Sequence, residues 1–144
     1  MEFCRGEKNR AYIVTAVDRI THTIVSWAVC GERTLEILQS VIDSAPPATD
    51  YYTDGFLMYQ DLSYWGNHTM LKDKSQTFSV EGGNADLRHY LARLGRSSRC
   101  FSRCFKALAR AVELFVYFYN ERQLRKKRHP KYPAYLAQNL PTLI

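Results

Sequence analysis

Three acidic residues stand at positions from which a folded chain could gather them into one site. Asp18 and Asp54 each follow a short β-rich run, and Glu81 falls in the first turn of an expected helix. Clustered carboxylates repel one another, so such a site either raises the pKa values of its members or binds divalent cations. Oxygen ligands suit Mg²⁺ or Mn²⁺, and two such ions can hold the attacking and leaving oxygens of a phosphodiester displacement.

Each acid also has a simpler explanation. An Asp at the end of a strand commonly binds the backbone of a turn, and Asp54-Gly55 is an ordinary turn pair. A Glu in the first turn of a helix complements the helix dipole. The residues alone leave both interpretations open. Which of them holds depends on where the strands and the helix place the three acids.

The segments before Asp18 and Asp54 should be strands. Residues 11–17 and 23–29 are β-rich and are separated by a short polar connection, a pattern that predicts a hairpin. Residues 50–53 predict a further short strand. If this strand neighbours 11–17, the two aspartates emerge at the same edge of one sheet, and a helix that crosses this edge adds the third carboxylate.

The other elements are expected to be mostly helical. Apolar residues recur at helical spacing in three segments, and two shorter segments complete the pattern: helices over 35–44, 79–94 and 101–121, one or two helical turns over 56–62, and a strand over 66–72. We expect the third helix to bury one side: Phe105, Leu108, Val112, Phe115 and Tyr119. The order of elements predicts an α/β fold with helices packed against a sheet.

Two glycines follow Glu81 directly. Glycine costs roughly 1 kcal/mol in a helix interior, so Gly82 and Gly83 need a reason. Either a DNA strand or a neighbouring loop approaches the backbone closely here, or the helix simply begins at Asn84.

The net charge of +6 is unevenly distributed. Residues 1–80 carry 7 basic and 10 acidic side chains, a net of −3, whereas residues 81–144 carry 13 and 4, a net of +9. A basic surface of this kind suits phosphates, although solvated Lys and Arg are also common on helices. We expect a domain over 1–121 and a basic, proline-broken tail over 122–144.

Membrane insertion is not expected. The longest apolar stretch has six residues, 114–119, whereas a membrane span needs roughly 20. The charged residues near Met1 are not typical of a signal peptide.

Four strings of the sequence carry a resemblance to a known family. They are Tyr52-Thr53-Asp54-Gly55 with Tyr59 after it, Val80-Glu81-Gly82-Gly83-Asn84 through Arg88-His89-Tyr90-Leu91-Ala92-Arg93-Leu94, Ala16-Val17-Asp18-Arg19, and Cys100-Phe101-Ser102. Together they resemble the catalytic domain of insertion-sequence-1 family transposases, over roughly residues 2–120. The block around Glu81 is the most specific part.

The resemblance implies an RNase H-like mixed sheet flanked by helices, with an additional C-terminal helix. It also implies a DDE triad, matched by Asp18, Asp54 and Glu81, which binds two Mg²⁺ or Mn²⁺ ions and cuts and joins DNA strands. The block around Glu81 and the basic C-terminal part supply the expected DNA-binding residues: Asn84, Arg88, His89, Arg93, Arg96, Lys126 and Lys127.

The expected function is therefore that of a DDE transposase catalytic domain in the prokaryotic cytoplasm, at the nucleoid. Its partners would be the ends of an insertion sequence, target DNA and further copies of the chain. Family members also carry an N-terminal zinc-binding and helix-turn-helix region that reads the element ends, and we expect this chain to depend on such a region from elsewhere. The alternatives are a catalytically inactive DNA-binding or regulatory remnant and a structure-selective nuclease of the same fold.

Overall fold

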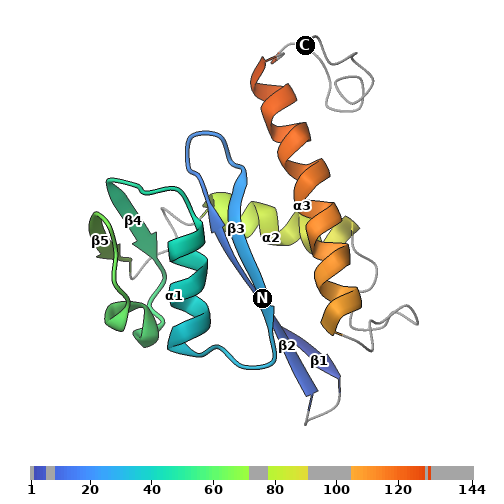
Figure 1. Ribbon diagram of the computed structural model, residues 1–144. Coiled ribbons are helices and arrows are strands. Elements are labelled where there is room, and N and C mark those ends of the chain that lie inside the picture. Colours follow the sequence, from blue (N-terminus) through green and yellow to red (C-terminus); the bar gives the residue numbers. More distant parts are fainter. Residues whose placement is uncertain (1, 6–8, 72–77, 91–104, 129, 131–144) are drawn as a thin grey trace.

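The computed structural model describes residues 2–5, 9–71, 78–90, 105–128 and 130 (Figure 1). Short strands and helices alternate along the chain, so the predicted α/β class is confirmed. The strands form two separate sheets, one of three strands and one of two.

The larger sheet is antiparallel, in the order β1-β2-β3. β2 (Asn9–Val17) and β3 (Ile24–Cys30) form the predicted hairpin, and a register irregularity at the end of β2 lies just before Asp18. β1 (Glu2–Arg5) pairs with the start of β2 and was not predicted. Four residues with a charge at each end carry little strand pattern, so only the pairing reveals this strand.

α1 (Leu35–Ser44) follows β3 and packs against β2 and β3. The side chain of Thr34 caps its start by accepting a hydrogen bond from the backbone N–H of Ile37 (3.4 Å). The helix ends before Pro46-Pro47, as predicted.

The smaller sheet consists of two parallel strands, β4 (Asp50–Thr53) and β5 (Asn67–Met70). The short 3₁₀ helix η1 (Leu57–Asp61) lies between them in the chain, so all three predicted segments are confirmed. β4 does not neighbour β2 in one sheet, so the condition under which Asp18 and Asp54 would share a sheet edge is not met. β2 is the middle strand of its own sheet, where β1 and β3 take its edges, and the backbone of β4 pairs with β5 instead.

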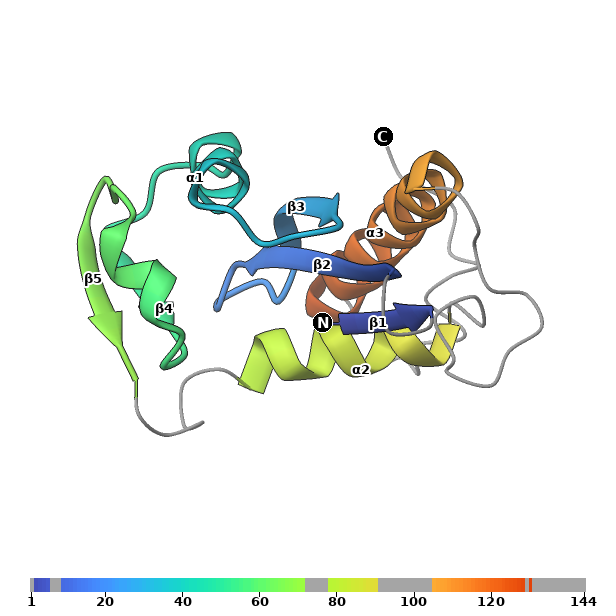
Figure 2. The same ribbon diagram turned by 90° about the horizontal axis from the view of Figure 1, so that it is seen from below.

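α2 (Phe78–Tyr90) lies across the face of the larger sheet opposite α1 (Figure 2). Residues 91–94, the end of the predicted helix, lie outside the described residues. Both glycines are inside the helix, so the interpretation that it begins at Asn84 is wrong. A Cβ on Gly83 would lie 3.5 Å from the hydroxyl of Tyr119, whereas one on Gly82 would meet nothing within 4 Å. The close neighbour at Gly83 is therefore another helix.

That helix is α3 (Phe105–Arg128), which runs alongside β3. It continues past Glu121, where the sequence predicted its end, because Leu, Lys and Arg are good helix formers and cations in the last turn complement the dipole. Residues 101–104 lie outside the described residues. Phe105, at the first position of the helix, is exposed rather than buried. The other four predicted inward residues are buried: Leu108, Val112, Phe115 and Tyr119.

The main hydrophobic core lies between the larger sheet, α2 and α3. Its buried members are Ala11, Ile13, Ile24, Leu87, Leu108, Val112, Phe115, Val116 and Tyr119. Two of the candidate carboxylates, Asp18 and Glu81, are thus attached to elements that share one core. Asp54 is attached to the smaller sheet.

Candidate catalytic and DNA-binding site

Asp18 forms the turn between β2 and β3. Its backbone N–H donates to the carbonyl of Thr23 (2.9 Å) and its own carbonyl accepts from His22 (2.8 Å). The carboxylate accepts from the backbone N–H of Thr21 (2.9 Å) and from the Thr21 hydroxyl, and more weakly from the N–H of Ile20 (3.4 Å). Asp18 therefore stabilises the turn, as the simpler explanation has it.

The surroundings of Asp18 favour its charged form. The Thr21 hydroxyl, two backbone N–H groups and the ammonium group of Lys127 lower the pKa of Asp18 below its ordinary value, against a smaller opposing effect of burial. This carboxylate is consequently ionised at neutral pH and carries a full negative charge at the tip of the hairpin.

Asp54 directly follows β4 and is exposed. One carboxylate oxygen accepts a hydrogen bond from the backbone N–H of Phe56 (3.1 Å). This is the hydrogen bond of an Asx turn, so Asp54, like Asp18, stabilises the chain reversal that follows its strand.

Glu81 lies in the first turn of α2, with its side chain exposed to solvent. Its charge complements the positive end of the helix dipole there. Each of the three acids therefore occupies the kind of local position that the sequence predicted.

The three acids are not assembled into a metal site. Among the residues that the structure describes, which include all three, no group of three or more His, Cys, Asp or Glu side chains could hold a metal ion. The expected convergence rested on β2 and β4 being neighbouring strands, and they lie in different sheets. Carboxylate oxygens suit Mg²⁺ or Mn²⁺ chemically, but in this structure these three residues do not form such a group.

The segments that carry Asp18 and Asp54 nevertheless touch. The guanidinium carbon of Arg19 lies 4.5 Å from the ring centre of Tyr52 in β4, a cation–π contact. Arg19 follows Asp18 in the chain, and Tyr52 precedes Asp54 by two residues. A side-chain contact, rather than a strand ladder, thus joins the hairpin tip to the smaller sheet.

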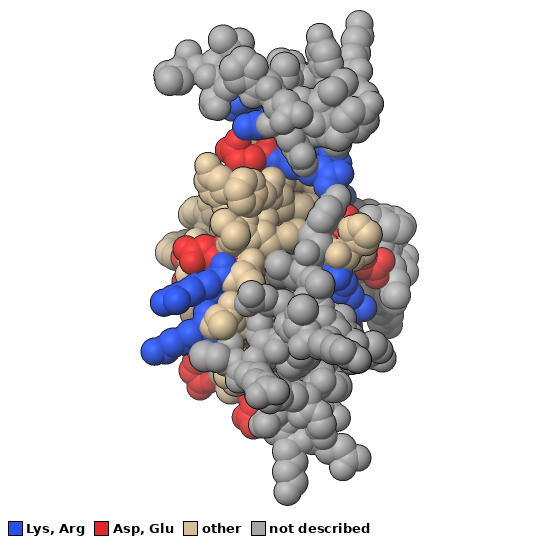
Figure 3. Space-filling model, turned by 90° about the vertical axis from the view of Figure 1, so that its right-hand side faces the viewer, with Lys and Arg blue, Asp and Glu red and all other residues tan. Residues whose placement is uncertain are grey.

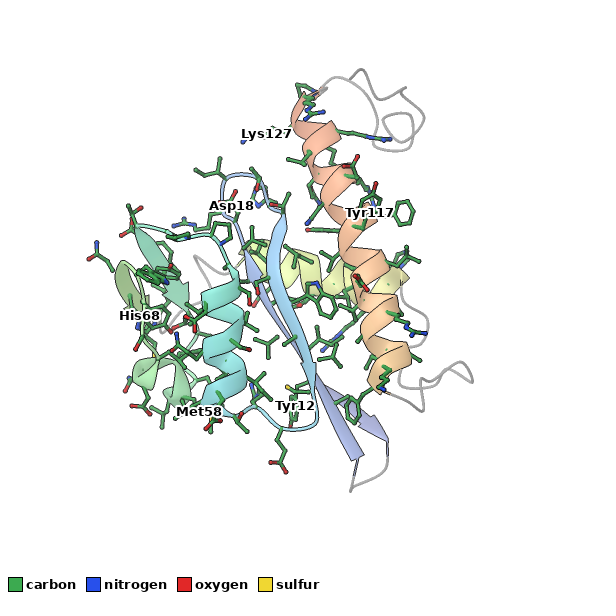
Figure 4. All side chains as sticks on the ribbon, in the orientation of Figure 1. Tyr12, Asp18, Met58, His68, Tyr117 and Lys127 are labelled. Atoms are coloured by element: carbon green, nitrogen blue, oxygen red, sulfur yellow. The ribbon has the colours of Figure 1, made fainter. Side chains whose placement is uncertain are left out.

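The basic end of α3 is close enough to Asp18 for the charge of Lys127 to lower the pKa of this carboxyl group. Figure 4 shows Asp18 on the hairpin turn and Lys127 near the end of α3, at the same end of the molecule. The last turn of α3 contains four consecutive cations, Arg125, Lys126, Lys127 and Arg128. Cations clustered in this way suit the phosphates of DNA.

Asn120 fixes this placement, and the sequence analysis missed it. Its side-chain amide donates to the carbonyl of Ile24 (2.8 Å), and its side-chain oxygen accepts from the N–H of the same residue (2.8 Å). Asn120 thus pairs with the free edge of β3 as another strand would. The available signal in the sequence was that Asn120 is a single amide side chain next to the apolar side of a long helix.

The predicted DNA-binding residues divide into three groups. On α2, Asn84 is half-buried, whereas Arg88 and His89 are exposed in the last turn. On α3, Lys126 is half-buried and Lys127 is exposed. The remaining two, Arg93 and Arg96, lie outside the described residues.

Comparison with known proteins identifies relatives. The sequence model of the IS1 transposase family matches residues 2–124. The chain is 38% identical to the insertion element IS1 protein InsB of Shigella flexneri over 101 residues, which is 68% of this chain and 75% of that protein. It is 35% identical to the IS1 2 protein InsB of Escherichia coli K12 over the same length, which is 59% of that protein.

The chain therefore spans less than two thirds of the length of the Escherichia coli relative. No solved structure matches. No helix in the described part of the chain is both long and apolar enough to cross a membrane. Because the family match covers most of the sequence and contains all three candidate carboxylates, the chain belongs to the IS1 transposase family.

Proposed function

We propose that this chain is the DNA-processing part of an insertion-sequence transposase, which cleaves a DNA strand and joins it to a new site in bacterial DNA. The observation that carries the proposal is the family match over residues 2–124. The basic end of α3, whose Lys127 charge reaches the candidate catalytic residue Asp18, supports it, because the cations there can bind DNA phosphates.

In this proposal Asp18, Asp54 and Glu81 act together on the phosphodiester, while Arg88, Lys126 and Lys127 neutralise the charge of the DNA backbone. Mg²⁺ or Mn²⁺, as two ions, is the cofactor that oxygen donors favour. Since the three carboxylates lie apart in this structure, we propose that DNA or a second copy of the chain draws β4 toward the hairpin tip and the start of α2. The Arg19–Tyr52 contact is the existing link along which β4 would approach.

An RNase H-like fold is part of the proposal. Three antiparallel strands, a helix and a further strand follow one another in the chain, which supports it. The described strands form two sheets rather than one mixed sheet, so the smaller sheet would have to join the larger one in the assembled enzyme.

A specific observation favours a second function, that of a catalytically inactive DNA-binding or regulatory transposase remnant. The carboxylates of Asp18 and Asp54 already bind the backbone of their own turns, and neither lies in a metal-binding group. The same basic helix end would bind DNA without cutting it.

Strand cleavage distinguishes the two functions. The chain, fused to a DNA-binding domain that supplies targeting, is assayed for nicking and strand joining with Mg²⁺ or Mn²⁺. Glu81→Gln should lower activity by orders of magnitude, because a neutral amide cannot replace a carboxylate charge in the reaction. The fold should survive, since Glu81 is exposed. Glu113→Gln, at another exposed acid, on α3, is the matched control.

The outcomes separate the proposals cleanly. If the parent fusion cleaves and Glu81→Gln retains full activity, the triad assignment is wrong. If the parent shows no metal-dependent cleavage under any condition, the inactive remnant is the better proposal. Cleavage without joining would indicate a nuclease of the same family.

DNA binding is tested separately, through its salt dependence. We expect binding of random and element-end DNA to be similar and to weaken with salt, by about 0.9 log units of affinity per log unit of salt for each phosphate contact. Lys127→Ala should reduce the magnitude of this slope by about 0.9, the value of one phosphate contact. Lys106→Ala, an exposed cation at the other end of α3, should leave it unchanged; an equal loss in both variants would contradict the site.

A further inference from the structure

The outer side of α3 is apolar at its middle. Leu114, Tyr117 and Phe118 are 59%, 63% and 62% exposed, and the two aromatic rings contact each other edge to face with centres 5.4 Å apart. Figure 3 shows this side of the molecule, with an area of uncharged surface bordered by acidic and basic groups. Large apolar side chains that adjoin one another on a surface mark sites of interaction rather than scattered exposure.

Charged residues bracket this apolar area along the helix. At about 100° per residue, Arg110 and Glu121 lie within roughly 40° of Leu114, one on each side of it along the axis. Arg110 is exposed, and the partly exposed carboxylate of Glu121 makes an ion pair with its helical neighbour Arg125 at 3.6 Å. Such a pair contributes little, so Glu121 can exchange it for another partner at small cost.

We propose that this side of α3 pairs with α3 of a second copy of the chain, in antiparallel orientation. Arg110 and Glu121 are 11 residues apart, which is about 16 Å along the helix. A two-fold axis midway between them places Arg110 of each copy opposite Glu121 of the other. The same axis places Leu114 opposite Tyr117 twice, so the apolar centres meet.

The charges favour an antiparallel over a parallel pair, and they favour a second copy of this chain as the partner. In a parallel pair Arg110 would face Arg110 and Glu121 would face Glu121, which repels at both ends of the contact. In the antiparallel pair the surface is complementary to itself, which is the requirement of a two-fold symmetric dimer. The pairing of two α3 helices involves none of the three candidate carboxylates, so it does not depend on whether the chain cleaves DNA.

One helix face is small for an interface, so the dimer should be weak and depend on protein concentration. Sedimentation velocity of the full chain, without DNA, is expected to show mass rising from 16.7 kDa toward twice that value as concentration increases. Arg110→Glu and Glu121→Arg should each raise the dimer dissociation constant by about tenfold or more, because like charges then face each other. The double variant, which restores opposite charges, should dimerise like the parent.

Phe118→Ser should also weaken the dimer, whereas Leu57→Ser, an exposed apolar residue on η1, should not. Unchanged helical circular dichroism shows that each variant is folded. A parent chain that stays monomeric at every concentration overturns the proposal, as does a dimer that neither charge reversal weakens or a double variant that is not restored. Loss of DNA affinity in Phe118→Ser with no change in self-association would instead assign this face to nucleic acid.

Discussion

Two regions of the molecule are stabilised by different interactions. One consists of the larger sheet with α2 and α3, and the other is the smaller β4–β5 sheet. The first buries aliphatic and aromatic side chains in one contiguous core. In residues 50–71, all of which the structure describes, Leu62 is the one buried hydrophobic residue. The smaller sheet relies instead on polar and aromatic contacts near the surface.

Those contacts centre on His68. Its ring stacks on Tyr64 with ring centres 4.1 Å apart, and its Nε2 makes a 2.8 Å hydrogen bond with the hydroxyl of Thr53. Gln39 of α1 holds the adjoining loop through hydrogen bonds to the backbone of Ser63 in both directions, at 2.9 and 3.0 Å. Exposed hydrogen bonds of this kind contribute less net stability than buried apolar area.

The difference bears on the proposed function. Asp54 belongs to the smaller sheet, and the assembly of the three carboxylates requires that sheet to move. Elements with few buried contacts open at a lower free energy than core elements. The part of the molecule that has to move is therefore the part that is easiest to move.

Truncating a buried leucine in each region should produce the largest contrast. Leu87 is 0% exposed in the main core, and Leu62 is 8% exposed at the smaller sheet. We expect Leu87→Ala to lower the free energy of unfolding by about 2–5 kcal/mol, because it leaves a cavity, and Leu62→Ala to cost clearly less. Urea unfolding measures both. Equal losses would show that the two regions share one core.

Gly66→Ala should disturb the smaller sheet alone. A Cβ at Gly66 would lie 2.3 Å from the carbonyl oxygen of Thr49, and backbone cannot yield there as a flexible side chain would. We expect a loss of about 1–3 kcal/mol, with faster amide hydrogen exchange in β4 and β5. Gly55→Ala is the matched control, because a Cβ there meets nothing within 4 Å.

Protection in β2 and β3 should stay as in the parent when Gly66 is replaced. Faster exchange throughout the larger sheet would mean that the two sheets unfold as one unit and would remove the contrast.

The smallest expected effect is a pH dependence confined to the smaller sheet. Burial lowers the pKa of His68 below its ordinary value of 6.5. At pH above about 6.5 the imidazole is neutral in both folded and unfolded chains, and its contribution to stability is fully present. As the pH falls through 6.5, the unfolded chain takes up the proton first, so stability decreases until the folded pKa is passed.

Hydrogen exchange at about pH 7.5 and 5.5, corrected for intrinsic rates, should therefore show loosening of β4 and β5 at the lower pH. Asp18 does not contribute in this range, because its hydrogen bonds with Thr21 lower its pKa below the ordinary value for an aspartate. His68→Gln should abolish the pH effect. If the variant loosens as the parent does, another group is responsible.

Local sequence pattern determined most of the elements. The hairpin around Asp18, the helix before Pro46-Pro47 and the strand 50–53 were predictable because strand alternation, turn residues and proline act over a few neighbouring residues. The local roles of the acids followed in the same way, since an Asp after a strand binds its own turn wherever that strand lies. The family was also recognisable from the strings around Asp54 and Glu81.

Only the tertiary structure decided which elements lie together. Whether β4 pairs with β2 or with β5 depends on which strand edges are free. β1, whose sequence has almost no strand pattern, occupies part of one edge of β2, and β4 pairs with β5. Gly83 against Tyr119, Asn120 on the edge of β3 and Lys127 beside Asp18 all join residues from different elements. Such contacts arise from packing and charge between segments far apart in the chain, and no window of sequence contains both partners.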